Sequence, residues 1–441
     1  MDNTLHRSKG FRNQLRQMAG LVGVSVPGLV LAALIEGTPQ DDFLEGTPEA
    51  DTLDGKAGID TMMGLGGNDT YIVSQSEDEI IEGAGEGIDS VKSIASYTLP
   101  IFVENLRLLG SLPINGSGNG LRNRLTGNAA NNVLNGRAGA DVMVGHDGDD
   151  TYFVESEDDA VIEVPNEGID TVSSSITYTL GANVQRLVLL GTSPINGFGN
   201  GLANQITGNT ASNVLSGGRG NDRLTGRDGR DTFLFAAPLD GSTNVDRVLD
   251  FNVVDDTIRL NGALFTAFAT NGALSEAMFR SGAAAADSSD RILYDPASGN
   301  VRYDADGTGP TGAVRFAVVP AGLAMTSADF VVSGAVATPV NYATQIQPIF
   351  TNRCVQCHSG SNPPRGLRLD STNSYANLVN VASSEIPSLK RVEPGDDNNS
   401  YLVQKIEGTA AVGVRMPASG EPLTAAQIRT IRLWIAEGAA Q

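Results

Sequence analysis

A nine-residue repeat begins near residue 36 and limits what the middle of this chain can fold into. Glycine returns at every ninth position from Gly37 to Gly64. An aspartate follows each glycine by five residues, and a large apolar residue follows each aspartate by two. The same pattern returns twice at offsets of 81 residues, so that Asp69, Asp150 and Asp231 are equivalent. A unit this short cannot bury a core alone, so the repeats must stack on one another.

The chemistry of the nonapeptide predicts a cation-binding coil. Glycine allows the turn to adopt positive φ, and the aspartate offers a hard oxygen ligand beside the turn carbonyls. The apolar residue points inward from a short strand. Two nonapeptides then form one coil of a parallel β-roll, and a calcium ion is expected between residues eighteen apart. The predicted calcium ligands are Asp42, Asp51, Asp60, Asp69, Asn123, Asn132, Asp141, Asp150, Asn204, Asn213, Asp222 and Asp231.

Residues 36–236 resemble the RTX (repeats-in-toxin) calcium-binding family, whose pattern is G-G-x-G-x-D-x-U-x. The resemblance implies a roll in three blocks with several bound Ca²⁺ ions. Because asparagine supplies a neutral oxygen, the second and third blocks are expected to bind calcium more weakly. The stretches between blocks, such as residues 74–117, alternate apolar and polar residues and are expected to continue the roll with wider turns.

Residues 237–332 differ from the repeats. The runs Asp246–Phe251 and Asp256–Leu260 resemble the strands that cap RTX rolls in proteins exported by the type I route. The run Asp329–Val332 resembles the export signal that ends such proteins, although here it is internal. Residues 333–340 are small and contain proline, which is typical of a linker.

Charge and the first residues indicate where the chain works. The net charge is −21, and the acidic residues gather in the repeats, which makes nucleic acid a poor partner and a cation a good one. Residues 1–35 join a basic segment to an uncharged apolar one. That order predicts an export signal or an N-terminal anchor, which is the one expected membrane contact. We expect an extracytoplasmic protein, secreted or at the cell surface, with the periplasm as the alternative.

A second signature lies near the other end, at Cys354-Val355-Gln356-Cys357-His358, and it contains the two cysteines of the chain. Two cysteines at this spacing followed by histidine form the attachment signature of a c-type haem. Cys354 and Cys357 are predicted to bind the haem vinyl groups, and His358 the iron. The alternatives are a redox dithiol or half of a zinc site, and the trailing histidine argues against both.

Met416 is the one methionine that follows the haem signature, and we predict that it is the second iron ligand. Helices are expected just before Cys354, from about Ser400 to Ile406, and from the capping box of Thr424 and Gln427 to about Ala436. Residues 341–441 resemble a small class I cytochrome c. That resemblance implies an all-α domain with one covalent haem c, and it places Phe350 near Trp434.

Three functions are compatible with these features. The first is a one-electron carrier, with a redox partner protein or an extracellular electron acceptor or donor. The second is a calcium-dependent structural or adhesive surface protein with incidental haem. The third is a peroxidase-like enzyme, which requires Met416 to be labile. The sequence contains neither His-Glu-x-x-His nor Gly-x-Ser-x-Gly, so electron transfer is expected rather than catalysis. Export by the N-terminal signal and by the type I route both stay open.

Overall fold

The computed structural model describes residues 32–268, 271–333, 340–418 and 421–441. The predicted export segment therefore lies almost wholly outside the described residues, as does most of the predicted linker. Among the described residues, no helix has the length and apolar character that crossing a membrane requires.

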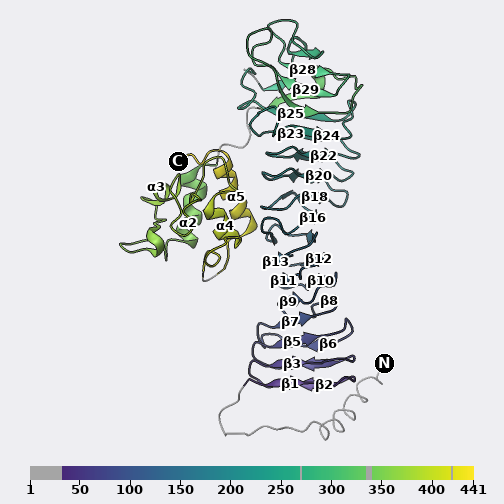
Figure 1. The fold of residues 1–441 in the computed structure, drawn as a ribbon, viewed down its shortest axis with the longest axis vertical. Coiled ribbons are helices and arrows are strands. Elements are labelled where there is room, and N and C mark those ends of the chain that lie inside the picture. The colour runs from purple at the N-terminus through teal and green to yellow at the C-terminus, as the bar shows by residue number, and fades with distance from the viewer. Residues whose placement is uncertain (1–31, 269–270, 334–339, 419–420) are drawn as a thin grey trace.

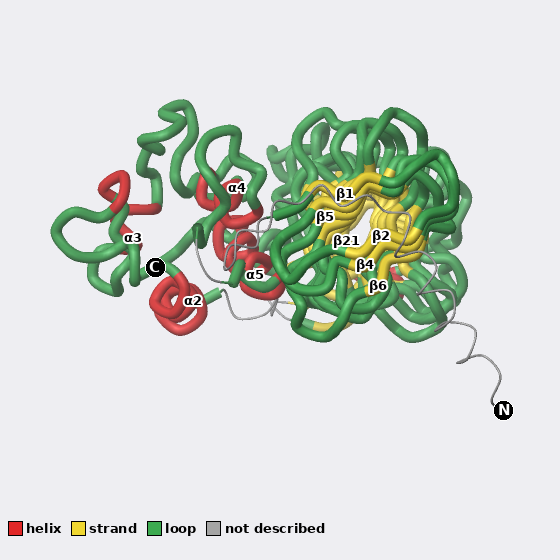
Figure 2. The backbone as a smooth tube through the Cα atoms, turned by 90° about the horizontal axis from the view of Figure 1, so that it is seen from below, coloured by secondary structure: helices red, strands yellow, loops and turns green. Residues whose placement is uncertain are grey.

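A parallel β-roll is the dominant feature, and its coils stack along the long axis of the molecule (Figure 1). Up to β25, and apart from two sheet breaks, each strand pairs in parallel with the strand after the next. Strand β1, Leu34–Glu36, pairs with β3, Thr52–Asp54, in a register offset by eighteen residues. Viewed along the axis, the strands superimpose as two walls around a core, and the helices lie outside the roll (Figure 2). The predicted roll is confirmed.

One wall contains the odd-numbered strands from β1 to β25, with β31 and β26, in two sheets. The first sheet comprises β1, β3, β5 (Thr70–Val73), β7 (Ser90–Ser93), β9 (Asn105–Leu108), β11 (Arg124–Thr126), β13 (Val142–Val144) and β15 (Ala160–Ile162). The second comprises β17 (Tyr178–Thr179), β19 (Gly197–Phe198), β21 (Val214–Ser216), β23 (Thr232–Phe235), β25 (Thr257–Asn261), β31 (Phe330–Ser333) and β26 (Gly272–Ala273).

The other wall also has two sheets. The shorter comprises β2 (Phe43–Glu45), β4 (Thr61–Met63) and β6 (Glu79–Ile81). The longer comprises β8 (Tyr97–Thr98), β10 (Gly116–Ser117), β12 (Val133–Asn135), β14 (Thr151–Val154), β16 (Thr171–Ser174), β18 (Arg186–Leu189), β20 (Gln205–Thr207), β22 (Arg223–Thr225), β24 (Asp246–Val248), β30 (Val314–Val318), β29 (Asn300–Tyr303), β28 (Ile292–Asp295) and β27 (Phe279–Ser281).

The core of the roll comes from the apolar position of the nonapeptide. Leu53, Met62 and Tyr71 are fully buried, and so are their counterparts in the later blocks. The stretches between blocks continue the stack, since β7 pairs with both β5 and β9. The coils there differ in length, because the register offset is twenty residues from Thr70 to Ser90 and fifteen from Ser90 to Asn105.

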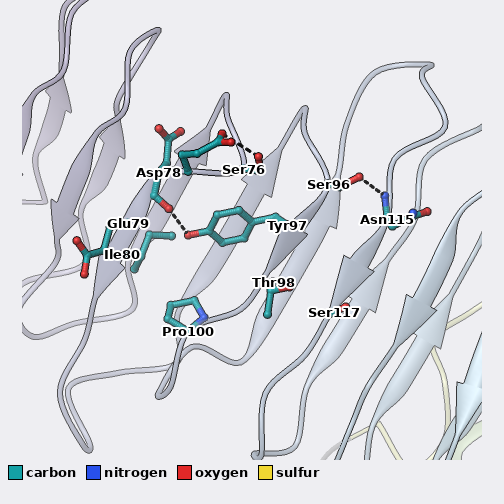
Figure 3. A pocket seen from close by; sticks show the side chains of 11 residues that line it. Ser76, Asp78, Glu79, Ile80, Ser96, Tyr97, Thr98, Pro100, Asn115 and Ser117 are labelled. Carbon is teal, nitrogen blue, oxygen red and sulfur yellow. Dashed lines mark hydrogen bonds between the residues drawn. The ribbon is translucent and has the colours of Figure 1, made fainter.

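The 81-residue superperiod is also visible in the sheet breaks. One wall breaks between β6 and β8, and the other breaks at the equivalent place between β15 and β17. At the first break the Tyr97 hydroxyl donates to the Asp78 carbonyl at 3.0 Å and lines a shallow surface hollow (Figure 3). Each superperiod contributes an odd number of strands. Strands at equivalent positions of successive blocks therefore lie in opposite walls, as β5, β14 and β23 do.

The roll extends to residue 261, beyond the predicted start of the cap at 237. Strand β24 pairs in parallel with β22, and β25 pairs in parallel with β23. Antiparallel pairing appears later, where β29 joins β28 to β30 and β26 joins β31. The 3₁₀ turns η1, Glu276–Met278, and η2, Ser327–Asp329, lie in this cap.

The C-terminal segment has a hydrophobic core of its own, distinct from that of the roll. The predicted helix before Cys354 is observed, and so are the helix near Ser400 and the terminal helix with its capping box of Thr424 and Gln427. The helical elements are η3 (Tyr342–Ile346), α2 (Gln347–Arg353), η4 (Pro364–Gly366), α3 (Ser374–Leu378), α4 (Tyr401–Glu407) and α5 (Ala425–Ala436). Much of the segment is loop, so an all-α cytochrome fold stays a prediction.

The Tyr342 ring lies between the two aromatic residues that the sequence predicts to be close. Its centroid is 6.4 Å from that of Phe350 and 5.1 Å from that of Trp434. The first and last helical elements of the segment therefore share one aromatic core.

The tight stacking of coils predicts a large cost for one added methyl group. A Cβ at position 168 would overlap the carbonyl oxygen of Gly148 in the preceding coil, and that atom is backbone. We expect Gly168→Ala to destabilise the roll by about 3 kcal/mol. At Gly120, which is exposed, an added Cβ meets nothing within 4 Å. Gly120→Ala should therefore change the unfolding free energy by at most about 0.5 kcal/mol. Urea denaturation in saturating calcium compares the two, and equal midpoints would contradict the close contact.

Candidate functional site

The repeat aspartates form two ladders, one along each edge of the roll. In six of them, one carboxylate oxygen accepts the backbone N–H of the repeat residue one coil earlier. The Asp60 Oδ1 is 2.8 Å from the nitrogen of Asp42, and the Asp150 Oδ1 is 2.6 Å from that of Asn132. The same bond joins Asp69 to Asp51, Asp141 to Asn123, Asp222 to Asn204, and Asp231 to Asn213. These bonds fix each carboxylate in the turn between two coils.

The second oxygen of these same aspartates has no partner. Among the described residues, six repeat aspartates each have a buried Oδ2 without a hydrogen bond: Asp60, Asp69, Asp141, Asp150, Asp222 and Asp231. A buried carboxylate oxygen without a partner is costly. Such oxygens occur in turns at both edges of the roll, and a free carboxylate oxygen is the kind of donor that a hard divalent cation needs.

The backbone of the turn explains why these oxygens are free. The residue four positions before each of the six aspartates has φ between 65° and 90°, which turns its N–H away from the carboxylate. These residues are Lys56, Leu65, Arg137, His146, Gly218 and Arg227. Left-handed backbone is unusual for most of these residue types, so these turns carry local backbone strain.

The other six predicted ligands lie in turns that close on themselves. The Asp51 Oδ2 accepts the Thr47 N–H at 2.6 Å and the Thr47 hydroxyl at 2.9 Å. The Asn132 Oδ1 accepts the Asn128 N–H at 2.8 Å, and its amide donates to the Ile114 carbonyl at 2.6 Å. Equivalent turn bonds occur at Asp42, Asn123, Asn204 and Asn213. The structure therefore divides the twelve predicted ligands into two sets of six.

Burial controls the protonation of the free carboxylates. It raises the pKa of Asp141, Asp150 and Asp231 to about 7, and that of Asp69 to about 6. Neighbouring acids raise them further, because each aspartate faces another in the next coil. A cation that replaced these protons would offset both the burial of the charged carboxylates and the repulsion between neighbouring acids.

Three segments of the chain match the RTX calcium-binding nonapeptide repeat family, in a unit of four copies: residues 36–71, 117–152 and 198–233. These segments are RTX calcium-binding repeats. All three segments lie within the roll. Each segment ends in the strand that follows the last repeat aspartate of its block, which is Asp69, Asp150 or Asp231. No curated protein matches the chain. The C-terminal segment lies outside the matched RTX repeats.

The predicted haem residues follow α2 in one tight turn. Cys354 caps the helix, and the His358 N–H donates to the Cys354 carbonyl at 2.9 Å. The His358 Nδ1 lies 3.1 Å from the Leu367 carbonyl oxygen. A carbonyl can only accept, so Nδ1 carries the proton and Nε2 is left with a free lone pair. That is the arrangement of a histidine that binds a metal.

The two thiols differ in environment. Cys354 is half-buried, and burial raises its pKa to about 11, whereas Cys357 is exposed. A redox dithiol needs a lowered thiol pKa, so the environment of Cys354 argues against that alternative.

Met416 lies in the loop between α4 and α5, and its side chain is half-buried. Its N–H donates to the Lys405 carbonyl of α4 at 2.8 Å, and the Arg415 side chain donates to the Ile406 carbonyl at 2.9 Å. These bonds tie the loop to α4. They leave the role of the sulfur as a prediction.

Sequence reasoning missed the acidic residues that continue the ladder beyond the repeats. Asp78, Asp89, Asp159, Asp170, Asp246 and Asp256 accept the N–H groups of the last aspartates of each block. The recurrence of Gly-Ile-Asp at Asp89 and Asp170 was the available signal.

Proposed function

We propose that this chain is a calcium-dependent structural scaffold of the extracytoplasmic space. The observation that carries the proposal is the set of six buried, unpaired carboxylate oxygens, each in a turn of left-handed backbone. Calcium at these turns would join adjacent coils. It would replace the repulsion between facing carboxylates by cation–carboxylate bonds. The RTX match supports calcium as the ion, and environments outside the cytosol supply calcium at the concentration that such modules need.

A matched pair of variants tests which turns bind. Asp60→Asn removes a carboxylate with a free oxygen, whereas Asp51→Asn installs the residue that the other blocks have at Asn132 and Asn213. We expect Asp60→Asn to lower the calcium bound per chain by about one ion, because a neutral oxygen holds Ca²⁺ more weakly. Asp51→Asn should leave it unchanged. Equilibrium dialysis gives both numbers, and equal losses in the two variants would contradict the division of the turns.

We also propose that the C-terminal segment binds one covalent haem c, with Cys354 and Cys357 as the attachment points and His358 and Met416 as iron ligands. The observation that supports it is the hydrogen bond from His358 Nδ1 to the Leu367 carbonyl, which leaves Nε2 as the nitrogen available to a metal. A haem held in this way supplies one-electron transfer to a redox partner. The hydrogen bonds of His358 and the bonds of the Met416 loop to α4 would keep both ligands oriented.

The haem proposal predicts a colour and a spectrum that depend on four residues. Protein produced with a haem-attachment system should keep its haem after denaturation and acetone extraction. The Cys354→Ser, Cys357→Ser double variant should be colourless, and His358→Ala should lose the low-spin spectrum. Met416→Ala should become high-spin, because an iron position is vacated. His146→Asn is the control, since His146 is an exposed turn residue of the roll. Colourless wild-type protein with two alkylatable thiols would contradict the proposal.

A further inference from the structure

Two of the repeat blocks end in a cluster of three carboxylates. Some members of each cluster lie outside the nonapeptide pattern. Asp150, Glu163 and Asp170 present one oxygen each, all within 4.8 Å of one another, and the equivalent residues Asp69, Glu82 and Asp89 do the same. Calcium holds its oxygen ligands at about 2.3–2.6 Å. Oxygens on one ion therefore lie up to about 5 Å apart, and the spacing fits a single cation.

The second cluster is deeply buried and lacks partners. Asp150, Glu163 and Asp170 are each about 1% exposed. The Asp150 Oδ2 and the Glu163 Oε2 have no hydrogen-bond partner, and both belong to the cluster. The other oxygens are used, since Asp150 Oδ1 accepts from Asn132 and Asp170 Oδ1 accepts the Asp150 N–H. Two buried oxygens that no protein group satisfies therefore belong to one cluster.

A tyrosine fixes the glutamate in each cluster. The Tyr152 hydroxyl donates to the Glu163 Oε1, and the Tyr71 hydroxyl donates to the Glu82 Oε1. Both tyrosines are fully buried. Position 145 is glycine, and a Cβ there would overlap both the Asp150 Oδ2 and the Tyr152 hydroxyl; Gly64 has the same relation to Asp69 and Tyr71. The space beside the oxygens is therefore kept clear by glycine in both blocks.

The charges that act on the second cluster are all negative. Glu167 and Asp149 raise the pKa of Asp150 in addition to its burial, and Glu167 also acts on Glu163. Burial raises the pKa of Glu163 to about 9. Negative neighbours of this kind favour a cation over a further carboxylate at the cluster.

The third block supplies a natural comparison. Offsets of 81 residues place Phe233 where the other blocks have Tyr152, and Asn244 where they have Glu163. Its last aspartate, Asp231, faces one carboxylate of the ladder, that of Asp256. The third block end therefore lacks the tyrosine and the glutamate of the first two, and the Asp250 carboxylate there accepts the N–H groups of Gly226 and Arg227.

We infer that Asp69, Glu82 and Asp89, and likewise Asp150, Glu163 and Asp170, form two high-affinity calcium sites that differ from the other repeat turns. This inference rests on the proposed calcium-dependent scaffold and specifies which of its sites fill first. Affinity for Ca²⁺ follows the number of charged ligands and the rigidity of the site. Three buried carboxylates, one of them fixed by tyrosine, should bind at least ten-fold more tightly than a turn with a single free carboxylate. As calcium is added, folding of the first two blocks would then begin at their C-terminal ends, where these sites lie.

The test is a titration of the calcium-depleted full chain with calcium and, separately, with terbium, which binds hard oxygen sites and emits when a nearby tyrosine absorbs. We expect two tight calcium ions per wild-type chain and a weaker class. Glu82→Gln, Glu163→Gln should lose the tight class and keep the weaker one, and each single variant should lose one ion. Tyr71→Phe, Tyr152→Phe should lose at least five-fold in sensitised emission and still bind calcium.

The outcomes separate the two proposals. A single class of calcium sites in the wild type, or a tight class that survives Glu82→Gln, Glu163→Gln, overturns the block-end sites and leaves the scaffold intact. Unchanged terbium emission in the tyrosine variant overturns them as well, and it does so even if the glutamate variant fails to fold. A wild-type chain that binds no calcium at all contradicts the scaffold itself.

Discussion

Removing calcium should unfold the RTX roll at neutral pH. In excess chelator at pH 7.5, we expect circular dichroism to lose most of the strand signal and the chain to expand in small-angle scattering. Restoring calcium to a few millimolar should reverse both changes. The reason is electrostatic, because the roll holds aspartates face to face between successive coils, and the free oxygens have no protein partner.

Simple linkage gives the size of this effect. A site held at a hundred times its Kd stabilises the folded state by about 2.7 kcal/mol, whereas whole domains are stable by roughly 5–15 kcal/mol. Losing three of the six free-carboxylate turns at that occupancy would therefore cost about 8 kcal/mol, which is comparable to the stability of a whole domain. With site affinities of about 10⁻⁴–10⁻³ M, the transition should fall in the millimolar range.

The C-terminal segment provides an internal control for chelation. Its core is separate from that of the roll, so the helical signal and the emission of Trp434 should persist in chelator. Magnesium at the same concentration should not refold the roll, because it demands a tighter octahedral shell. Identical strand content with chelator and with calcium would contradict the scaffold.

Acid should partly replace calcium. Without the ion, burial raises the pKa of Asp141, Asp150 and Asp231 to about 7 from an ordinary value near 3.8. The folded chain then binds these protons more strongly than the unfolded chain. Their contribution to stability is fully present below about pH 4 and is lost as the pH rises through 7. Glu163, with its pKa raised to about 9, extends the loss to higher pH.

Urea denaturation in chelator at pH 5.5 and at pH 8 measures this dependence. We expect a higher midpoint, and more strand signal before denaturation, at pH 5.5. In saturating calcium the order should invert, since protons compete with the ion and binding releases them. Apo protein that becomes more stable between pH 5.5 and pH 8 would show that the buried carboxylates are charged without a cation.

The repeat was sufficient to predict the roll because each unit of nine residues places a turn glycine, an oxygen ligand and an apolar core residue at fixed positions. Leu53 and Met62 are buried as the pattern requires, and the eighteen-residue register follows from two repeats per coil. The extension of the roll to residue 261 was less visible, since Asp246 and Asp256 continue the ladder at spacings of 24 and 25 residues from Asp222 and Asp231.

The candidate site was predictable in part. The nine-residue spacing predicted the twelve ladder residues. It could not show that the Asp51 Oδ2 accepts hydrogen bonds whereas the Asp60 Oδ2 has none. That difference depends on whether the turn places an N–H on the carboxylate, which Thr47 does and the left-handed Lys56 does not. Glu82 and Glu163 were missed because they occupy a position that is glycine in the repeats. In the C-terminal segment, the spacing of Cys354, Cys357 and His358 predicts haem chemistry, whereas the Leu367 carbonyl that orients His358 is visible only after folding.

Anomalous diffraction from crystals of the full chain grown in calcium tests the central claim most directly. The account predicts a peak beside the Oδ2 of each free aspartate, namely Asp60, Asp69, Asp141, Asp150, Asp222 and Asp231. It predicts none at the self-closed turns that contain Asn123 or Asn204. Turns that bind no ion in saturating calcium, with those oxygens bonded to water or to protein, would contradict it.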